Sequence, residues 1–418
     1  MKTVILFVTT FLVPAMFCIA PALPAHAGEE VTKDGVLHVL NPATPSEGRE
    51  IIQLEEVWRV GGEDSEDFFG MISQVIIGED GTVYLLDTRL SEVPVYSPSG
   101  ERLATLSREG EGPGETRIPS NLLFMPDGTL GIVQVFPGKI TKIKTDGTPA
   151  GVFKAGNGDP TEGGFLQLFD CVTSGEDVII TAESISQTEP GQQDRTNFVA
   201  AYDLEGHETI RFWERTRNLD FAQFEFIEDE RARVDYRKMA VGEDGRFYLV
   251  VERNRYAINV YHPDGTLERV IEREYVHHSR TDQEIARLRS ALEVQLRQLP
   301  DPKIEISRTE PDIGDLNFGN DGNLWVGTSQ GGTDQPEGIL YTWDVFTPDG
   351  HFLKQVSAAC PGDGENDLLI WTPSGDAVQV TGFTDAMLAL QGGVGATEEE
   401  DAEEPEPMEV IYYRVAGL

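Results

Sequence analysis

Three arginines stand out as cations that could hold an anionic ligand in a strongly acidic chain. Arg89, Arg253 and Arg255 lie in short polar loops between β-rich runs. Guanidinium groups recognise carboxylates and phosphates through paired, charge-assisted hydrogen bonds. Two interpretations stay open. The arginines pair with neighbouring Asp and Glu residues to order their own loops, or they face a ligand that carries a carboxylate or phosphate.

Carboxylates share these loops and the glycine-rich segment that follows them. Asp87 precedes Arg89, and Glu111 and Glu115 lie in the segment 109–115. Carboxylate oxygens suit Ca²⁺, although the spacing does not say which of them converge. We therefore treat Asp87, Glu111, Glu115 and the three arginines as ligand-face candidates, with Ca²⁺ as a candidate cofactor.

One pair of histidines is a candidate for binding a transition metal. His277 and His278 are adjacent, whereas three other histidines lie in or next to turns at the opposite end of the expected strands, and His38 precedes the first repeat. A zinc site needs at least a third protein ligand, which the sequence does not show. The alternative is a solvated strand end without metal.

No motif assigns a catalytic residue. A nucleophile elbow is absent, and the glycines of segment 110–114 do not lead into a helix, so they lack the geometry of a phosphate-binding loop. We therefore assign no catalytic residue from the sequence.

Paired glycine turns organise the elements that must position these side chains. A turn such as Asp80-Gly81 before a β-branched or aromatic run is typical of a hairpin, because glycine accepts the positive φ that tight turns need. Two turn types alternate along the chain, the first at Gly81, Gly128, Gly175, Gly245 and Gly322, the second at Gly100, Gly147, Gly206, Gly265 and Gly350. Each unit then holds four strands, which is typical of a β-propeller blade.

A sixth unit is expected from the two ends of the chain. Strands are expected at residues 377–380, 386–390 and 408–415, and residues 51–60 supply the last strand; the assignment of residues 368–374 is left open. A strand borrowed from the other terminus removes the free sheet edges. The sequence therefore predicts an all-β fold, a six-bladed β-propeller over residues 51–418 with one inserted α-helix.

The order of the strands separates two ends of the propeller. Both turn types lie at one end, and the loops between second and third strands lie at the other end with the blade connectors. This second end, the connector end, carries all the ligand-face candidates. Loops presented by a rigid scaffold are where function usually lies.

Two segments interrupt the repeat. Thr281 and Glu284 form a capping box at the start of a helix predicted over residues 281–298. We expect this helix either to cover part of the channel mouth at the connector end, or to be an insert whose leucine stripe covers an exposed apolar edge. Residues 397–407 are rich in Glu and Pro and are expected to form a disordered acidic loop.

The segment Gly110-Glu111-Gly112-Pro113-Gly114 resembles the blade connectors of NHL-type propellers and of related exported bacterial six-bladed propellers. Asp87-Thr88-Arg89 and Arg253-Asn254-Arg255, each followed by a strand and a glycine turn, fit the same pattern. The resemblance implies the fold and is nearly silent on function, because propellers include binders, lyases and lactonases. We expect a module that binds a protein or small molecule as a scaffold or for recognition. The alternative is a metal-dependent enzyme of the lactonase or lyase type.

The N-terminal sequence and the net charge limit the possible compartments and partners. Residues 1–27 have the pattern of a secretory signal, with Lys2, an apolar stretch and Ala25-His26-Ala27, and residues 28–50 form an extension. We expect an exported protein, periplasmic or extracellular, with no membrane span after signal removal. The net charge of −39 disfavours nucleic acid and anionic membranes as partners.

Two cysteines, Cys171 and Cys360, remain after the signal. Export permits a disulfide. The repeat count places them about half a ring apart, so we expect two free buried thiols.

Overall fold

The computed structural model describes residues 28–63, 65, 67–156, 164–230, 236–372, 375–392 and 407–415. The expected signal at 1–27 and all but the last residue of the expected acidic loop at 397–407 lie outside the described residues. β-Strands dominate the remaining chain, with two α-helices among the described residues.

Three separate four-stranded antiparallel sheets follow one another in sequence. Neighbouring strands are consecutive in each, as expected for hairpins joined by tight turns. The first contains β4 (Ile72–Ile77), β5 (Val83–Asp87), β6 (Val93–Tyr96) and β7 (Arg102–Leu106). The second contains β8 (Pro119–Phe124), β9 (Leu130–Gln134), β10 (Lys139–Ile143) and β11 (Pro149–Phe153). The third contains β12 (Gly164–Ser174), β13 (Asp177–Glu189), β14 (Gln192–Tyr202) and β15 (Glu208–Asp220).

A fourth set of four strands is extended by the N-terminal segment. The set contains β17 (Met239–Val241), β18 (Phe247–Leu249), β19 (Ala257–Tyr261) and β20 (Leu267–Arg273). β1 (Glu29–Lys33) and β2 (Val36–Asn41) form a hairpin, and β2 pairs in parallel with β20. Most of the 28–50 extension is therefore folded onto the outer edge of this sheet.

The last sheet has eight strands and joins both ends of the chain. It contains β22 (Ile313–Phe318), β23 (Leu324–Thr328), β24 (Tyr341–Phe346), β25 (Phe352–Ala359), β26 (Leu368–Trp371), β27 (Ala377–Val380) and β28 (Glu409–Val415), together with the N-terminal strand β3 (Arg49–Gly61). The first residues of β3 pair in parallel with β25, and its later residues pair antiparallel with β28. One long strand thus bridges two groups of strands.

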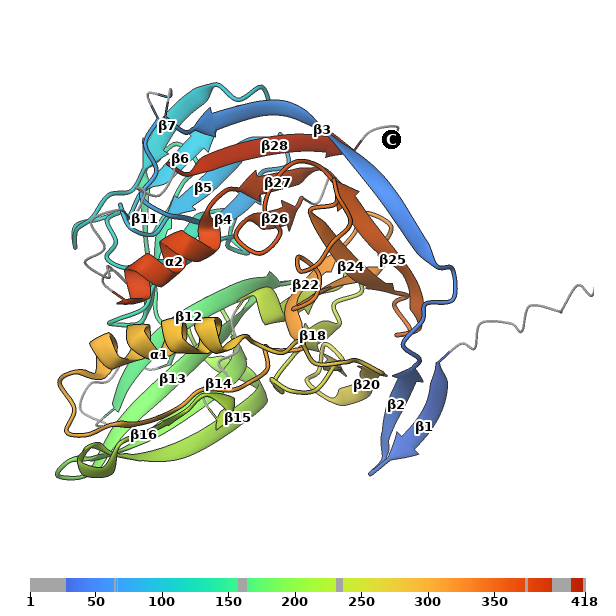
Figure 1. Ribbon diagram of the computed structural model, residues 1–418. Helices are drawn as coiled ribbons and strands as arrows, with labels where there is room; N and C mark the ends of the chain where they lie inside the picture. Colours follow the sequence, from blue (N-terminus) through green and yellow to red (C-terminus); the bar gives the residue numbers. More distant parts are fainter. Residues whose placement is uncertain are drawn as a thin grey trace, which may run out of the picture.

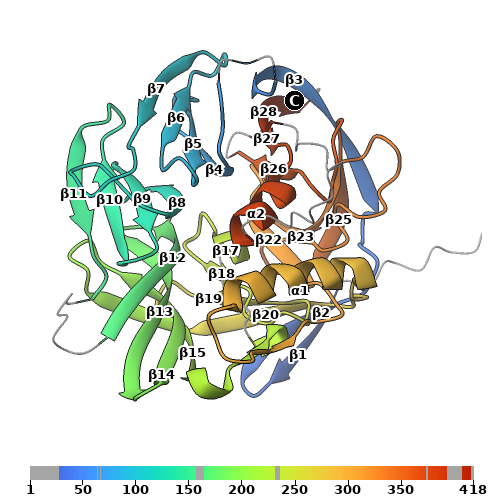
Figure 2. The same ribbon diagram turned by 60° about the vertical axis from the view of Figure 1, so that its left-hand side comes forward.

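The sheets are arranged around a common centre (Figure 2). Successive antiparallel sheets whose first strands lie inside and whose last strands lie outside define a β-propeller. The two turn types of one sheet lie at the same end of its strands: a Cβ on Gly81 would meet the Pro98 ring at 3.0 Å. Gly81 also has φ +81°, in the left-handed region that favours glycine.

The prediction of a strand at residues 386–390 is wrong. Residues 386–390 belong to helix α2 (Phe383–Gly392), and β26 supplies the strand that pairs with β27. Phe383, Ala386 and Met387 follow a spacing of three and four residues and pack on one hydrophobic cluster. This is the period of a helix, not the alternation of a strand.

The inserted helix α1 extends over Asp282–Leu296. Thr281 is its N-cap and forms the reciprocal capping box with Glu284. No residue of α1 is fully buried, so its apolar stripe is only partly covered. Figure 2 shows α1 and α2 lying across the ring, and the Arg287–Asp385 ion pair (2.7 Å) joins them.

Short elements surround α1. They are η2 (Phe221–Gln223), β16 (Glu225–Ile227), η3 (Glu228–Glu230), η4 (Tyr236–Lys238) and β21 (Lys303–Glu305). β16 and β21 pair in parallel and bring the segment after β15 next to the segment after α1.

The core lies between neighbouring sheets. Trp58 of β3 stacks on Tyr96 at 6.0 Å and on Tyr412 at 5.2 Å, which joins β3 and β28 to the sheet β4–β7. Arg273 and Asp344 form an ion pair between β20 and β24, and Tyr256 also donates a hydrogen bond to Asp344. The aromatic contacts bury apolar surface between the sheets, and burial of apolar surface is the main driving force for folding.

Two further observations concern the cysteines and membranes. Cys171 and Cys360 are free and buried. Among the described residues, no helix is long and apolar enough to cross a bilayer.

Candidate functional site

The sheet β12–β15 protrudes beyond its neighbours at the connector end (Figure 1). β13 has 13 residues and β14 has 11, whereas β5 has five and β6 has four. The first half of β13 is buried in the ring, and its last four residues are exposed. The extra length therefore forms a wall that stands above the ring.

A cavity of about 1010 Å³ lies against this wall; we call it the larger cavity. Its lining comes from β13–β15, from the short elements η2 to η4, and from single residues of α1 and of the loop after β18. These elements interrupt the propeller repeat. Its volume is at the upper end of the range for small-molecule sites.

A second cavity of about 620 Å³, the smaller cavity, lies beside α1 and α2. Arg287 and Asp385, which join the two helices, both line it. Gly332 and Gly364 let two of its loops approach closely, because a Cβ on Gly332 would lie 1.9 Å from the Gly364 carbonyl oxygen. Pro311 lines both cavities.

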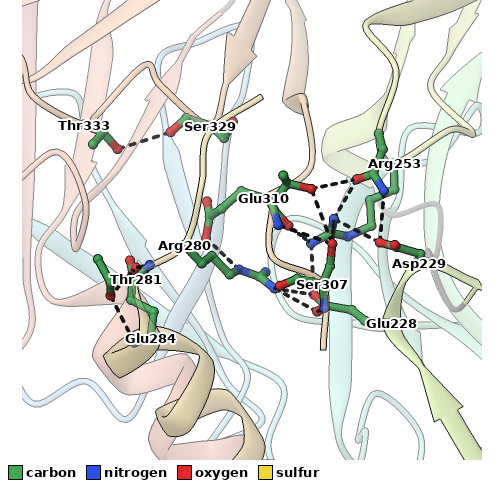
Figure 3. A network of polar contacts seen from close by, with 12 residues as sticks. Glu228, Asp229, Arg253, Arg280, Thr281, Glu284, Ser307, Glu310, Ser329 and Thr333 are labelled. Carbon is green, nitrogen blue, oxygen red and sulfur yellow. Dashed lines mark hydrogen bonds and ion pairs between the residues drawn. The ribbon is translucent and has the colours of Figure 1, made fainter. Parts of the chain in front are cut away.

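Arg253 is the centre of a polar network at the edge of the larger cavity (Figure 3). Its guanidinium donates to Glu228 (3.1 Å), to the Ser307 hydroxyl (3.1 Å) and to the Thr309 carbonyl oxygen (2.6 Å). It also reaches Asp229 at 3.4 Å. Only 5 % of the Arg253 side chain is exposed.

Arg280, just before α1, shares the Glu228 carboxylate with Arg253 (Figure 3). Its Nη1 lies 2.9 and 2.8 Å from the two oxygens of Glu228, and its Nε lies 3.4 Å from Glu310. Arg253 lines the larger cavity and Arg280 the smaller one. The network is thus a shared wall between the cavities, and it ties η3, the β18–β19 loop and the segment after β21 together.

Arg253 and Arg255, the two ligand-face candidates of the β18–β19 loop, are both paired with carboxylates of the protein. Arg253 is enclosed by its loop partners. Arg255 pairs with Glu252 (2.9 Å) and with Glu272 of β20 (2.7 Å), on the side of the sheet that carries the N-terminal hairpin. Their contacts match the alternative in which arginines order their own loops.

Asp87 is fully buried and holds the backbone of two loops. Its carboxylate accepts hydrogen bonds from the amides of Gly70 (2.7 Å), Met71 (3.1 Å), Arg89 (3.1 Å) and Leu90 (2.9 Å). Four donors satisfy the buried carboxylate, so it is not open to a ligand. The Arg89 side chain itself is exposed.

Glu111 and Glu115 lie in the connector before β8. Glu115 accepts from Arg108 (2.6 Å) and from the Gly112 amide (2.8 Å), and these bonds lower the pKa of its carboxyl. Glu111 pairs with Arg117 at 2.8 Å. None of the six ligand-face candidates except Arg253 lines the larger cavity.

The two candidate metal ligands diverge. His277 Nδ1 lies 2.7 Å from Asp312 Oδ1, whereas His278 lines the smaller cavity. Burial raises the pKa of Asp312, and the His277 hydrogen bond opposes that rise. Within the described parts of the chain, no three His, Cys, Asp or Glu side chains are close enough to hold a metal ion.

Residues that sequence reasoning missed line the larger cavity. Glu183 of β13 is 2 % exposed and accepts from Arg195 (3.1 Å) and Asn197 (3.0 Å) of β14. Arg217 of β15 lies 3.8 Å from the same carboxylate. The sequence contains one signal that could have located them, the distance along the chain between turns. The turns at Gly175 and Gly206 are further apart than those at Gly81 and Gly100, which indicates longer strands.

The arrangement can bind a polar molecule. Charged and amide side chains line the larger cavity, and most of its charges are already paired. A ligand there would exchange hydrogen bonds with a wall that is fixed by strands, which favours precise positioning.

No known protein family matches the sequence, and neither does any curated protein. Solved structures with a similar backbone include virginiamycin B lyase from Staphylococcus aureus. That protein is 11% identical to this chain, the match covers 77% of this chain and 80% of that chain, and the TM-score is 0.39. An exported protein from Bacteroides fragilis has 9% identity, 88% and 99% coverage, and a TM-score of 0.48. Regucalcin, a calcium-binding protein from Agrobacterium tumefaciens, has 10% identity, 87% and 96% coverage, and a TM-score of 0.40. At these scores the likenesses carry no argument, and the propeller assignment rests on the strand topology.

Proposed function

We propose that this protein is an exported six-bladed β-propeller of the NHL-like kind that binds a small polar ligand in the larger cavity. The count of six is supported by five consecutive runs of four strands and by a sixth run, β26–β28, completed by β3. Export is supported by the pattern of residues 1–27.

The observation that carries the binding role is the origin of the larger cavity. Its walls are Glu183 of β13, Arg195 of β14, residues 217–220 of β15, side chains of η2, β16, η3 and η4, and one side chain of α1. The regular sheets β4–β7 and β8–β11 contribute nothing to it. Additions to a rigid scaffold that converge on one concave space are where binding residues are usually found.

The test is a thermal-shift screen of the full mature chain with amino acids, short peptides, monosaccharides and dicarboxylates. Gln223, an exposed residue of η2 that lines the larger cavity, is replaced by Trp to fill it. Gln283→Trp on the exposed start of α1 is the matched control. We expect at least one probe class to raise Tm in the wild type and the control but not in Gln223→Trp. A probe that stabilises all three proteins equally would refute the site.

The metal-dependent enzyme is tested in the same preparations. Metal analysis before and after chelation gives the content of Ca²⁺ and Zn²⁺. Stoichiometric metal that is lost together with a hydrolytic or lyase activity would replace the binding role by the enzymatic one.

A further inference from the structure

The charges that line the larger cavity are nearly all paired, and the exceptions indicate the chemistry of the ligand. Arg195 pairs with Glu183 and Arg253 with Glu228, both at 3.1 Å. Glu225 pairs with Lys303 at 3.2 Å. These pairs need no ligand.

The remaining lining charges lie around η2 and η3. Asp220 caps η2 by accepting from the Ala222 amide at 2.8 Å. Arg217 donates to the Glu230 carbonyl oxygen at 3.3 Å, in addition to its contact with Glu183. Only the backbone of Glu230 takes part in this bond.

Two charges of opposite sign are left over. Among the residues that the structure describes, neither the Lys238 ammonium nor the Glu230 carboxylate has a hydrogen-bond or ion-pair partner, although both residues line the larger cavity. Lys238 ends η4 and is half-buried, and Glu230 ends η3. An unpaired charge at the wall of a cavity is a ready partner for a ligand group of opposite charge.

We propose that the larger cavity binds a zwitterion, a short peptide with free termini, whose carboxylate meets Lys238 and whose ammonium meets Glu230. The inference rests on the proposed binding function and names its ligand class. A net charge of −39 repels anions in general, so a carboxylate needs a local cation that no protein group neutralises.

The volume favours a peptide over a free amino acid. A cavity of about 1010 Å³ exceeds the need of one residue. A peptide also carries main-chain N–H and C=O groups that must find partners when they leave water. Asn218 and Gln223 line the same cavity and offer amide donors and acceptors.

Isothermal titration calorimetry of the full mature chain tests the inference with four probes: triglycine, N-acetyl-triglycine, triglycine amide and glycine. We expect triglycine to bind most tightly. Blocking either terminus removes one charge-assisted contact and should weaken binding by about tenfold. Glycine should bind more weakly than triglycine.

Two charge variants assign the termini. Lys238→Ala should abolish the preference for triglycine over its amide and keep the preference over the acetylated form. Glu230→Gln should do the reverse. Lys144→Ala and Glu176→Gln, both exposed in turns at the opposite end, are matched controls and should change neither preference.

The outcomes separate this inference from the proposed function. Equal binding of the acetylated or amidated peptide, or no binding of any of the four probes, overturns the zwitterion. The proposed function survives either result if another probe still loses its stabilising effect in Gln223→Trp. If no probe depends on Gln223, the proposed function itself fails.

Discussion

The sheets β4–β7 and β12–β15 share one strand order and differ in how far their strands reach. β5 is buried along its whole length, whereas β13 is buried only in its first part and then extends into solvent. The short sheet ends in loops that Asp87 fixes from within. The long sheet ends in a wall, and Glu183, in the buried part of β13, lines the larger cavity together with Arg195.

One kind of repeat thus supplies both the scaffold and the site. Inter-sheet packing needs only the part of each strand inside the ring. Any length added beyond that part costs little core packing and can face a ligand. Substitutions inside the ring should therefore affect stability, and substitutions in the added parts should affect local order and binding.

The largest effect is expected inside the ring. Trp58→Ala removes stacking on Tyr96 and Tyr412 and should lower the free energy of unfolding by about 3–5 kcal/mol. Urea unfolding measures the change. Val57→Ala, on the same strand but 40% exposed, is the control and should have little effect. A comparable loss for both variants would show that burial in the ring does not set the stability.

The second effect concerns the N-terminal hairpin and depends on pH. Burial alone would raise the pKa of Glu272, but hydrogen bonds from Arg255, His38 and Lys33 lower it to about 2. Because this pKa is below that of the unfolded chain, Glu272 stabilises the fold above about pH 4.5. This contribution, up to about 3 kcal/mol, is lost as the pH falls toward 2. Urea unfolding from pH 2 to pH 7 measures it, and Glu272→Gln should remove this share of the acid sensitivity. An unchanged acid profile in that variant would contradict the assignment.

The third effect is expected at the wall between the cavities. Glu228→Gln removes the carboxylate charge that Arg253 and Arg280 share. This should lower the free energy of unfolding by about 1–3 kcal/mol. Hydrogen exchange should become faster in the β18–β19 loop and in the segment 303–310, and stay unchanged in β4–β7. Glu111→Gln, which breaks one exposed pair, is the control. Faster exchange throughout the ring would mean that scaffold and site are one cooperative unit.

The smallest effect is expected where α1 meets α2. Arg287→Ala breaks an ion pair between two half-exposed side chains. It should lower the free energy of unfolding by less than about 1 kcal/mol. Hydrogen exchange of α1 should nevertheless increase, because no residue of this helix is fully buried. A loss of stability close to that of Trp58→Ala would show that α1 belongs to the scaffold.

Local signals in the sequence were sufficient for most of the scaffold. Glycine turns, β-branched and aromatic runs, and the capping box at Thr281 act over a few residues, so they can be recognised without the fold. Residues 386–390 could not be assigned from local signals, because five apolar or small residues are compatible with a strand or a helix. In the structure they form a helix that packs on one hydrophobic cluster.

The site could not be predicted in the same way. Glu183, Arg195 and Lys238 come from three elements that the fold brings to one cavity. Asp87 fits a ligand-binding position in sequence, yet its carboxylate is used by four backbone amides. Some carboxylates have all their hydrogen bonds supplied by the protein itself. Some of the donors come from residues distant in sequence, so these carboxylates can be recognised only in the three-dimensional structure.

Hydrogen exchange of the mature chain, measured with and without a stabilising probe, locates the binding site. If the larger cavity is the binding site, the probe should slow exchange in β13–β15 and in the segment from η2 to η3, while β4–β7 stays unchanged. Protection confined to β4–β7, or to the turns at the opposite end of the ring, would contradict it.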